Sequence, residues 1–228
     1  MKYTAERKLS VNIAFFICIL VGMFFIPYVF NLILSNFITN SNISELLSNV
    51  LYIEILYLIY YKDLNSEFKI FKEKFKKNMT LGFKYYFVGV FLMIFSNIII
   101  SLTVGDISAN ETLVREQLFS NMVFSMISIS IIAPITEELI FRKSLMPILK
   151  NKWVYAFFCG LLFGLAHLIS GEMTWISLVY LLPYGSLGFV FALMNKETKT
   201  TFTSITIHAI HNTFTGTLLL ILYFSGIV

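Results

Sequence analysis

Long apolar runs separated by short polar stretches make up almost the whole chain. Each run is about as long as the roughly 20 residues that a helix needs to cross the hydrocarbon core of a bilayer. The pattern predicts an all-α fold, a polytopic transmembrane helical bundle of about seven spans. The predicted spans cover residues 11–36, 45–61, 81–103, 118–149, 153–169, 174–194 and 202–226.

Composition supports this fold class and argues against a soluble or nucleic-acid-binding protein. The 228 residues are 57% hydrophobic and only 13% charged, whereas soluble domains carry about 25% charged residues. The net charge of +4 comes from Lys and Arg in short connections between apolar runs, which is typical of membrane topology. We therefore expect the lipid bilayer as its surroundings and no nucleic-acid partner.

The connections between the runs alternate in charge. One set is rich in Lys and Arg, and the other set has at most one such residue. The basic set is the N-terminus, 62–78, 143–152 and 195–200, and the other set is 37–44, 104–117 and 169–174. Since cytoplasmic connections carry the excess of Lys and Arg, we predict a multi-pass cell-membrane protein. Its N-terminus would be cytoplasmic and its C-terminus outside.

The connection 62–78 is unusual because it combines six Lys residues with an apolar stripe. Phe68, Phe71 and Phe75 recur there at helical spacing. This combination predicts a basic amphipathic helix lying on an anionic membrane surface, with a solvated basic loop as the alternative. With the first three spans it forms an N-terminal part, residues 1–117, that precedes a second part, residues 118–228.

The second part contains three charged residues at bilayer depth. Glu137, Glu138 and Arg142 lie within the fourth run, where one charge costs about 2.5–3.5 kcal/mol on insertion scales. On an α-helix Glu138 and Arg142 are four residues apart, with the acid on the favourable side for an ion pair. Glu137 points about 100° away, so it stays available as a general base. The alternative is a buried ion-pair network that only fixes helix packing.

All three histidines of the chain lie in its last third. His167 ends the apolar stretch that begins at Phe163, while His208 and Asn212 share one face of the last span. His211 lies off that face, and we interpret it as a packing residue. With the glutamate pair, these side chains could activate a water and stabilise an oxyanion. We expect an active site buried between spans four, five and seven.

Three motifs on successive spans resemble the signature of a known family. They are Glu-Glu-x-x-x-Arg from Glu137, Phe-x-x-x-His from Phe163 and His-x-x-x-Asn from His208. The chain is similar over residues 118–226 to the CPBP family, also called Abi or CAAX-protease-like. That family resembles the prenyl-protein endopeptidases that trim CAAX tails, and it includes bacteriocin-immunity proteins.

The resemblance implies a protease that works within the membrane. It would be an endopeptidase that hydrolyses a peptide bond of a membrane-presented peptide or protein. Glu137 would activate the water, His167 would hold it, and His208 and Asn212 would stabilise the oxyanion. Glu138 and Arg142 would fix span four as a supporting ion pair.

A metalloprotease and a non-enzymatic role both stay open. Glu137, His167 and His208 could ligate a divalent metal such as zinc and leave the fourth position open. The chain has no His-Glu-x-x-His motif, and we favour glutamate-activated water without a tightly bound metal. The alternative function is a bacteriocin-immunity or regulatory membrane protein of the same fold.

The depths of the site residues do not match along a regular set of spans. Glu137 and His167 lie about 20–22 Å from the basic ends of their spans, at 1.5 Å per residue. His208 lies only about 14 Å from Lys199 by the same measure. Either span seven begins deeper than the others, or residues 195–202 dip into the bilayer.

Overall fold

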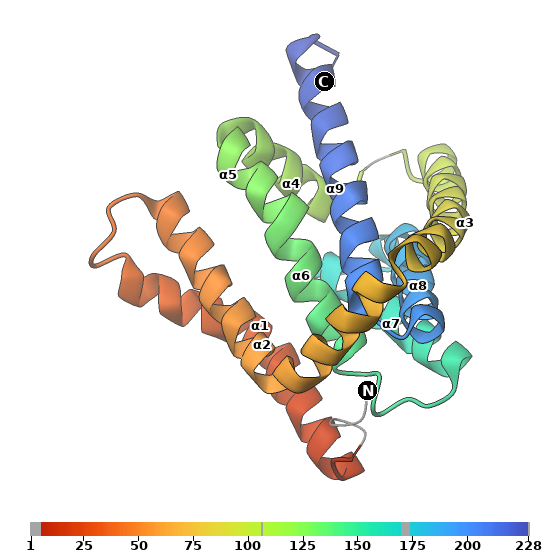
Figure 1. The fold of residues 1–228 in the computed structure, drawn as a ribbon. Helices are drawn as coiled ribbons and strands as arrows, with labels where there is room; N and C mark the ends of the chain where they lie inside the picture. The colour runs from red at the N-terminus through yellow and green to blue at the C-terminus, as the bar shows by residue number, and fades with distance from the viewer. Residues whose placement is uncertain (1–5, 106, 170–173, 228) are drawn as a thin grey trace.

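The protein is described by a computed structural model that covers residues 6–105, 107–169 and 174–227, and every regular element in these ranges is a helix (Figure 1). Six helical segments among them are long and apolar enough to cross a membrane, and a shorter apolar helix, α7, corresponds to the fifth predicted span. The predicted polytopic helical bundle is thus confirmed. The seven segments are α1 (Leu9–Leu34), α2 (Ser41–Glu73), α3 (Phe75–Thr103), Met122–Lys143, α7 (Lys152–Leu168), Ser177–Thr198 and α9 (Thr201–Phe224).

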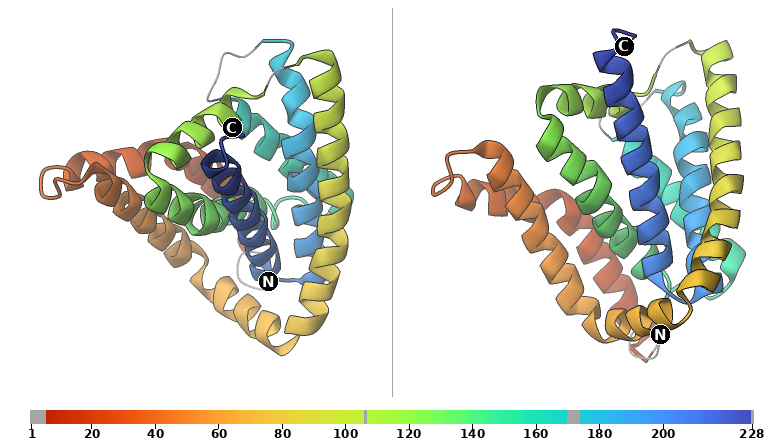
Figure 2. Two further views of the ribbon diagram at one scale, coloured as in Figure 1. Left: turned by 90° about the horizontal axis from the view of Figure 1, so that it is seen from above. Right: turned by 45° about the horizontal axis from the view of Figure 1, so that its top comes forward.

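The helix α9 is the central element of the bundle. It packs against α2 and α3, against the Met122–Lys143 segment, and against α8 (Leu181–Thr198), which follows a short 3-10 helix, η3 (Ser177–Tyr180). The hairpin of α1 and α2 extends to one side, and α3, α7 and α8 form the other side (Figures 1 and 2). The helix α1 begins and the helix α9 ends at opposite ends of the molecule (Figure 1). The side of the membrane on which each terminus lies stays a prediction.

Close contact between α7 and α8 depends on glycines. A Cβ on Gly160 would lie 2.7 Å from the carbonyl oxygen of Gly185, and one on Gly188 would lie 2.9 Å from the Cα of Gly160. Small residues allow helix backbones to approach each other closely in membranes, where packing replaces the hydrophobic effect as the driving force. This contact fixes the helix that carries His167.

The fourth span differs from the prediction in its bounds and in its winding. It covers 122–143 rather than 118–149, and two π-helical stretches interrupt it. Residues 109–117 were predicted as part of a polar loop and residues 118–120 as the start of span four. Ala109–Ser120 instead form the helix α4, which the Ser108 hydroxyl caps by accepting from the Glu111 N–H. The span consists of α5 (Met122–Ile127), η1 (Ser128–Ile132), α6 (Ala133–Glu137) and η2 (Glu138–Lys143).

The basic segment 62–78 is helical, as predicted, but it is not a separate helix, and its position on a membrane surface stays a prediction. The helix α2 continues to Glu73, and α3 begins after Lys74 alone. The segment has two faces, as the pattern indicated, but its inner face packs on the protein. Asp63 is 1% exposed and Glu67 is fully buried. The lysines face outward, whereas the two acids face the bundle, and the acids therefore need partners inside it.

The start of α9 explains how His208 reaches the depth of the other site residues although it lies close to Lys199 in sequence. The turn at Lys199 has a left-handed backbone (φ 59°), and the Thr201 that follows is fully buried. Its N–H donates to Glu67 Oε2 at 2.8 Å, and the ring of Phe202 lies 5.1 Å from that of Phe68. The end of α2 covers this turn, so span seven begins inside the protein rather than at its surface.

Candidate active site

A fully buried ion pair forms the base of the candidate site. Arg142 Nη1 lies 3.2 Å from Glu138 Oε1, and neither side chain is exposed. The guanidinium lies over the ring of Phe163 from α7, 4.3 Å from its centre, and near the ring of Phe191 from α8. An aromatic face stabilises a cation that has lost its water. The aromatic residues of two neighbouring helices therefore help to hold this charge inside the bundle.

His208 of α9 lies between the two glutamates. Its Nδ1 is 3.1 Å from Glu138 Oε1, and its Nε2 is 3.6 Å from Glu137 Oε2. Because the paired Glu138 is an acceptor, we infer from the hydrogen bond that Nδ1 carries a proton, which directs Nε2 towards Glu137. The carboxylates of span four and the imidazole of span seven thus meet at one point.

The two glutamates differ in exposure. The side chain of Glu137 is 21% exposed, whereas that of Glu138 is fully buried. The 3.6 Å separation between Glu137 and His208 is too long for a direct hydrogen bond. Glu137 is therefore the carboxylate of the two that a water or a substrate can reach.

His167 of α7 is held by a backbone carbonyl and by an aromatic ring. Its Nδ1 lies 2.8 Å from the Phe163 carbonyl oxygen, and its ring stacks on that of Tyr184 of α8 at 4.5 Å. The Tyr184 hydroxyl is in turn hydrogen-bonded to Ser108 at 2.8 Å and to Asn110 of α4 at 3.3 Å. A carbonyl only accepts, so Nδ1 is the donor and Nε2 is left as an acceptor in the neutral ring. The helix α4 was predicted as a loop, and its contribution to the site was therefore missed.

Asn212 connects α9 to the first π-helical stretch of span four. Its Nδ2 donates to the Ile129 carbonyl oxygen at 2.8 Å. In η1 the Ala133 N–H donates to the Ser128 carbonyl, five residues back. If this π-helical pattern continued, the N–H of residue 134 would donate to the Ile129 carbonyl. That residue is Pro134, which has no N–H, so the Ile129 carbonyl loses its partner within the helix. The Asn212 amide supplies the missing donor and keeps a second N–H.

His211 lies away from the other site residues. Its Nδ1 is 3.1 Å from the hydroxyl of Tyr86 on α3, and its ring packs edge-on against the Tyr86 ring. The interpretation of His211 as a packing residue agrees with this position.

The side chains of the candidate site do not fit a zinc site with three protein ligands. In the part of the chain that the structure describes, no three His, Cys, Asp or Glu side chains are grouped so that they could hold a metal ion. His208 Nδ1 faces a carboxylate and His167 Nδ1 faces a carbonyl, contacts that also orient metal-ligating histidines, so these hydrogen bonds do not decide the question. The grouping of the side chains alone argues against the ligand set of Glu137, His167 and His208, and the use of a metal is tested by the chelator experiment below.

A second buried ionic cluster was not predicted. Lys143, the residue after Arg142, lies 2.5 Å from Glu67 Oε1 and 3.5 Å from Asp63 Oδ2, and all three side chains are at most 1% exposed. Glu67 also accepts the Thr201 N–H, so this cluster joins α2, η2 and α9. One sequence signal was available, because Asp63 and Glu67 are four residues apart and share a helical face within a segment rich in Lys.

Comparison with known proteins gives related sequences and no related solved structure. The family model "Type II CAAX prenyl endopeptidase Rce1-like" matches residues 119–214, which include every candidate site residue. "Putative membrane peptidase YdiL" of Bacillus subtilis is 30% identical over 149 residues, 61% of this chain and 57% of that protein. "UPF0177 protein YbdI" of Lactococcus lactis is 30% identical over 141 residues, 58% of this chain and 75% of that protein. No solved structure matches the chain.

Proposed function

The chain belongs to the CPBP, or CAAX-protease-like, family, and from that premise we propose that it is an intramembrane endopeptidase with Glu137 as its general base. The observation that carries the proposal is the position of His208, with one ring nitrogen on each of two adjacent carboxylates. The match spans 57% of the Bacillus subtilis relative, so the activity is proposed from the site.

The proposed reaction begins with a water beside Glu137. The Glu137 carboxylate takes a proton from this water while the water oxygen attacks the carbonyl carbon of the peptide bond. The electron pair of the C=O bond moves to its oxygen and forms the tetrahedral oxyanion. When the oxyanion collapses, the C–N bond breaks and Glu137 returns its proton to the leaving amine. The Nε2 of His167 would accept a hydrogen of the water and hold it in place.

Two donors would stabilise the oxyanion. One is the second N–H of Asn212, and the other is Nε2 of His208 in the imidazolium form, whose charge has carboxylate neighbours at Glu137 and Glu138. Donors fixed before the reaction are effective because they need no rearrangement in the transition state. Glu138 would orient His208 through Nδ1, while Arg142 holds Glu138. The substrate would be a peptide or membrane protein presented at or in the bilayer.

Replacing Glu137 by Gln tests the proposal, because Gln keeps the shape but cannot accept the proton. The purified full chain in liposomes would be incubated with a library of synthetic membrane-associated peptides, and product masses would be recorded. We expect Glu137→Gln to lower the cleavage rate by at least about 10²-fold with normal insertion. Glu45→Gln, a change at an exposed carboxylate at the start of α2, is the matched control and should cleave at the wild-type rate.

Two further measurements separate the alternatives. With glutamate-activated water, cleavage persists after treatment with a strong chelator, and elemental analysis finds less than one zinc per chain. Cleavage that is lost on chelation and restored only by zinc would overturn this assignment. The second measurement compares cells that carry the wild-type protein with cells that carry Glu137→Gln. If any cellular effect of the protein persists in Glu137→Gln, proteolysis does not cause that effect, and the immunity or regulatory role is favoured.

A further inference from the structure

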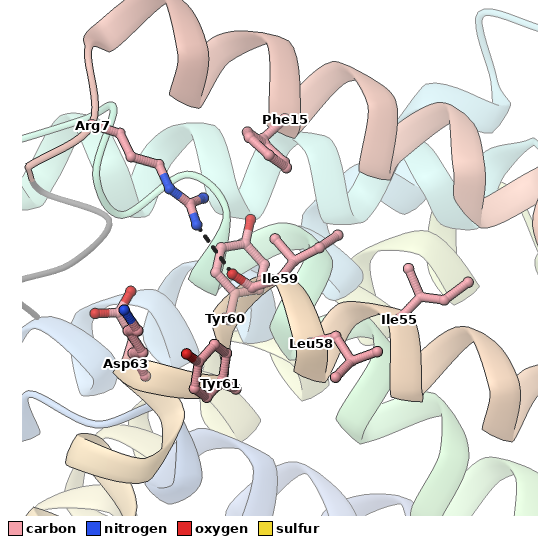
Figure 3. A pocket seen from close by; sticks show the side chains of 9 residues that line it. Arg7, Phe15, Ile55, Leu58, Ile59, Tyr60, Tyr61 and Asp63 are labelled. Atoms are coloured by element: carbon pink, nitrogen blue, oxygen red, sulfur yellow. Dashed lines mark hydrogen bonds between the residues drawn. The ribbon is translucent and has the colours of Figure 1, made fainter.

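A cavity of about 540 Å³ lies between α1 and α2, outside the candidate active site (Figure 3). Arg7 and Lys62 supply cationic groups to its wall, and Phe15, Ile55 and Leu58 supply apolar ones. Neither the candidate catalytic residues nor the buried Glu138–Arg142 pair line it. Its lining therefore needs a separate explanation.

The cationic and apolar groups are separated along α2. Leu58 and Ile55 precede Lys62 by roughly 6 and 10 Å at 1.5 Å per residue. Arg7 lies before α1, and its guanidinium reaches over the Phe15 ring to the Ile59 carbonyl. Arg7 and Lys62 thus lie towards one end of the cavity, and Leu58 and Ile55 extend towards the other. A ligand that matches this wall has an anionic group at one end and a hydrocarbon chain at the other.

Arg7 is poised to bind an oxyanion. Its Nη2 donates to the Ile59 carbonyl oxygen at 3.2 Å, and its guanidinium carbon lies 4.8 Å from the centre of the Phe15 ring (Figure 3). Its Nη1 is shielded from solvent and has no hydrogen-bond partner among the residues that the structure describes. Leaving a charged donor unsatisfied is costly, and a phosphate oxygen would satisfy it with a strong hydrogen bond.

The charges around the cavity favour an anion. Asp63 is its one acidic lining residue, against the two cations Arg7 and Lys62. The Asp63 carboxylate is also 3.5 Å from Lys143 Nζ, on the inner side of α2. The charges of Arg7, Lys62 and Asp63 therefore give the wall a net positive charge, even though Lys143, which does not line the cavity, is left out of the sum.

We propose that this cavity binds the headgroup of an anionic phospholipid. The phosphate lies between Arg7 and Lys62, and an acyl chain runs along Ile55 and Leu58. A bilayer lipid fits better than free phosphate because the apolar wall is continuous with surface that faces outward, where Leu58 is 64% exposed. The proposal is independent of the peptidase function and concerns a lipid bound to the N-terminal helices.

Native mass spectrometry of the purified full chain tests it. The delipidated protein in detergent would be titrated with phosphatidylglycerol, with phosphatidylcholine of the same chains, and with inorganic phosphate. We expect phosphatidylglycerol to bind most tightly and millimolar phosphate to leave its binding unchanged. Lys62→Gln should weaken phosphatidylglycerol binding about fivefold, and Arg7→Gln, which also loses a charge-assisted hydrogen bond, roughly tenfold or more.

Two variants make the result specific to the cavity. Lys8 is next to Arg7, but it is exposed and does not line the cavity. Lys8→Gln removes one positive charge there and should leave phosphatidylglycerol binding unchanged. Leu58→Trp alters the apolar wall without changing charge and should weaken binding even if Arg7→Gln does not fold.

Three results would overturn the proposal. Equal losses in Lys8→Gln and Lys62→Gln would mean diffuse surface attraction rather than a site. Equal binding of the two lipids would mean that the headgroup charge is not recognised. Competition by inorganic phosphate at equal concentration would mean a soluble anion site instead of a lipid site.

Discussion

The bond between Asn212 and the Ile129 carbonyl gives a test of how span seven is attached to span four. Pro134 removes the N–H that the π-helical pattern would offer to this carbonyl, and Asn212 supplies a replacement at 2.8 Å. Asn212→Ala leaves the carbonyl without that donor in a half-buried position. An unsatisfied buried acceptor costs about 1–3 kcal/mol. We therefore expect a loss in the free energy of unfolding of about that size.

A second substitution should reduce this loss. Pro134→Ala restores a backbone N–H five residues after Ile129, where it can donate to the same carbonyl. In the Pro134→Ala background, Asn212→Ala should therefore cost less than in the wild type, with a coupling of about 0.5–3 kcal/mol between the two sites. Unfolding in detergent, followed by heat or denaturant, measures the four proteins of the cycle.

The same four proteins separate the structural role of Asn212 from its proposed catalytic role. If Asn212 also stabilises the oxyanion, the double variant regains stability but does not regain peptide cleavage. Additive losses of stability would refute the reasoning, because they would mean that Pro134 and Asn212 do not act on the same carbonyl. Thr213→Ala is the matched control, since its hydroxyl donates to the Ala209 carbonyl within α9 and should show no coupling to Pro134.

Three other predictions follow from the buried charges and the loop pattern. Arg142→Met should destabilise the protein by about 3–5 kcal/mol, as expected for a broken buried pair, and the added change Glu138→Gln should reduce this loss in the same unfolding assay. Lys143→Met should destabilise by a similar amount, because it leaves two buried carboxylates without their cation. A topology reporter placed in 62–78 should report the cytoplasm, and one fused at the C-terminus should report the outside.

An exposed ion pair serves as the control for the buried one. Glu111 and Arg115 in α4 are also four residues apart, at 2.9 Å, but their side chains are 36% and 31% exposed. Removing this pair should show a coupling of only about 0.3–0.5 kcal/mol. Equal couplings for the two pairs would mean that burial does not determine the strength of the Glu138–Arg142 pair.

A cytoplasmic C-terminal reporter would mean that the number of spans is wrong.

The sequence predicted the features that depend on the bilayer or on local spacing. The bilayer sets the length of an apolar run that can span it, so the seven runs could be identified without any tertiary information. The ion pair in span four could also be predicted from the sequence, because the spacing of Glu138 and Arg142 brings side chains together on any helix. Whether the candidate residues catalyse a reaction is a question for the substitutions above.

The features that the sequence did not predict depend on contacts between distant segments. Lys143 and Glu67 are 76 residues apart, and no local pattern pairs them. Excess Lys around Glu67 suggested a solvated or membrane-facing segment, and only the packed structure shows that its acids face inward. Tyr184 similarly connects His167 to α4 through hydroxyl contacts over more than 70 residues of sequence.

The junction between Glu137 and Glu138 shows how local winding can change a site that spacing alone describes incompletely. On a regular α-helix adjacent residues point about 100° apart, which would direct the two carboxylates to different neighbours. In the structure Glu137 ends α6 and Glu138 begins the π-helical η2, and both carboxylates lie within 3.6 Å of the same His208 ring. The two acids therefore differ in exposure rather than in the residue that they face. Arg142 neutralises the buried acid, and the division of roles proposed for them depends on which one water can reach.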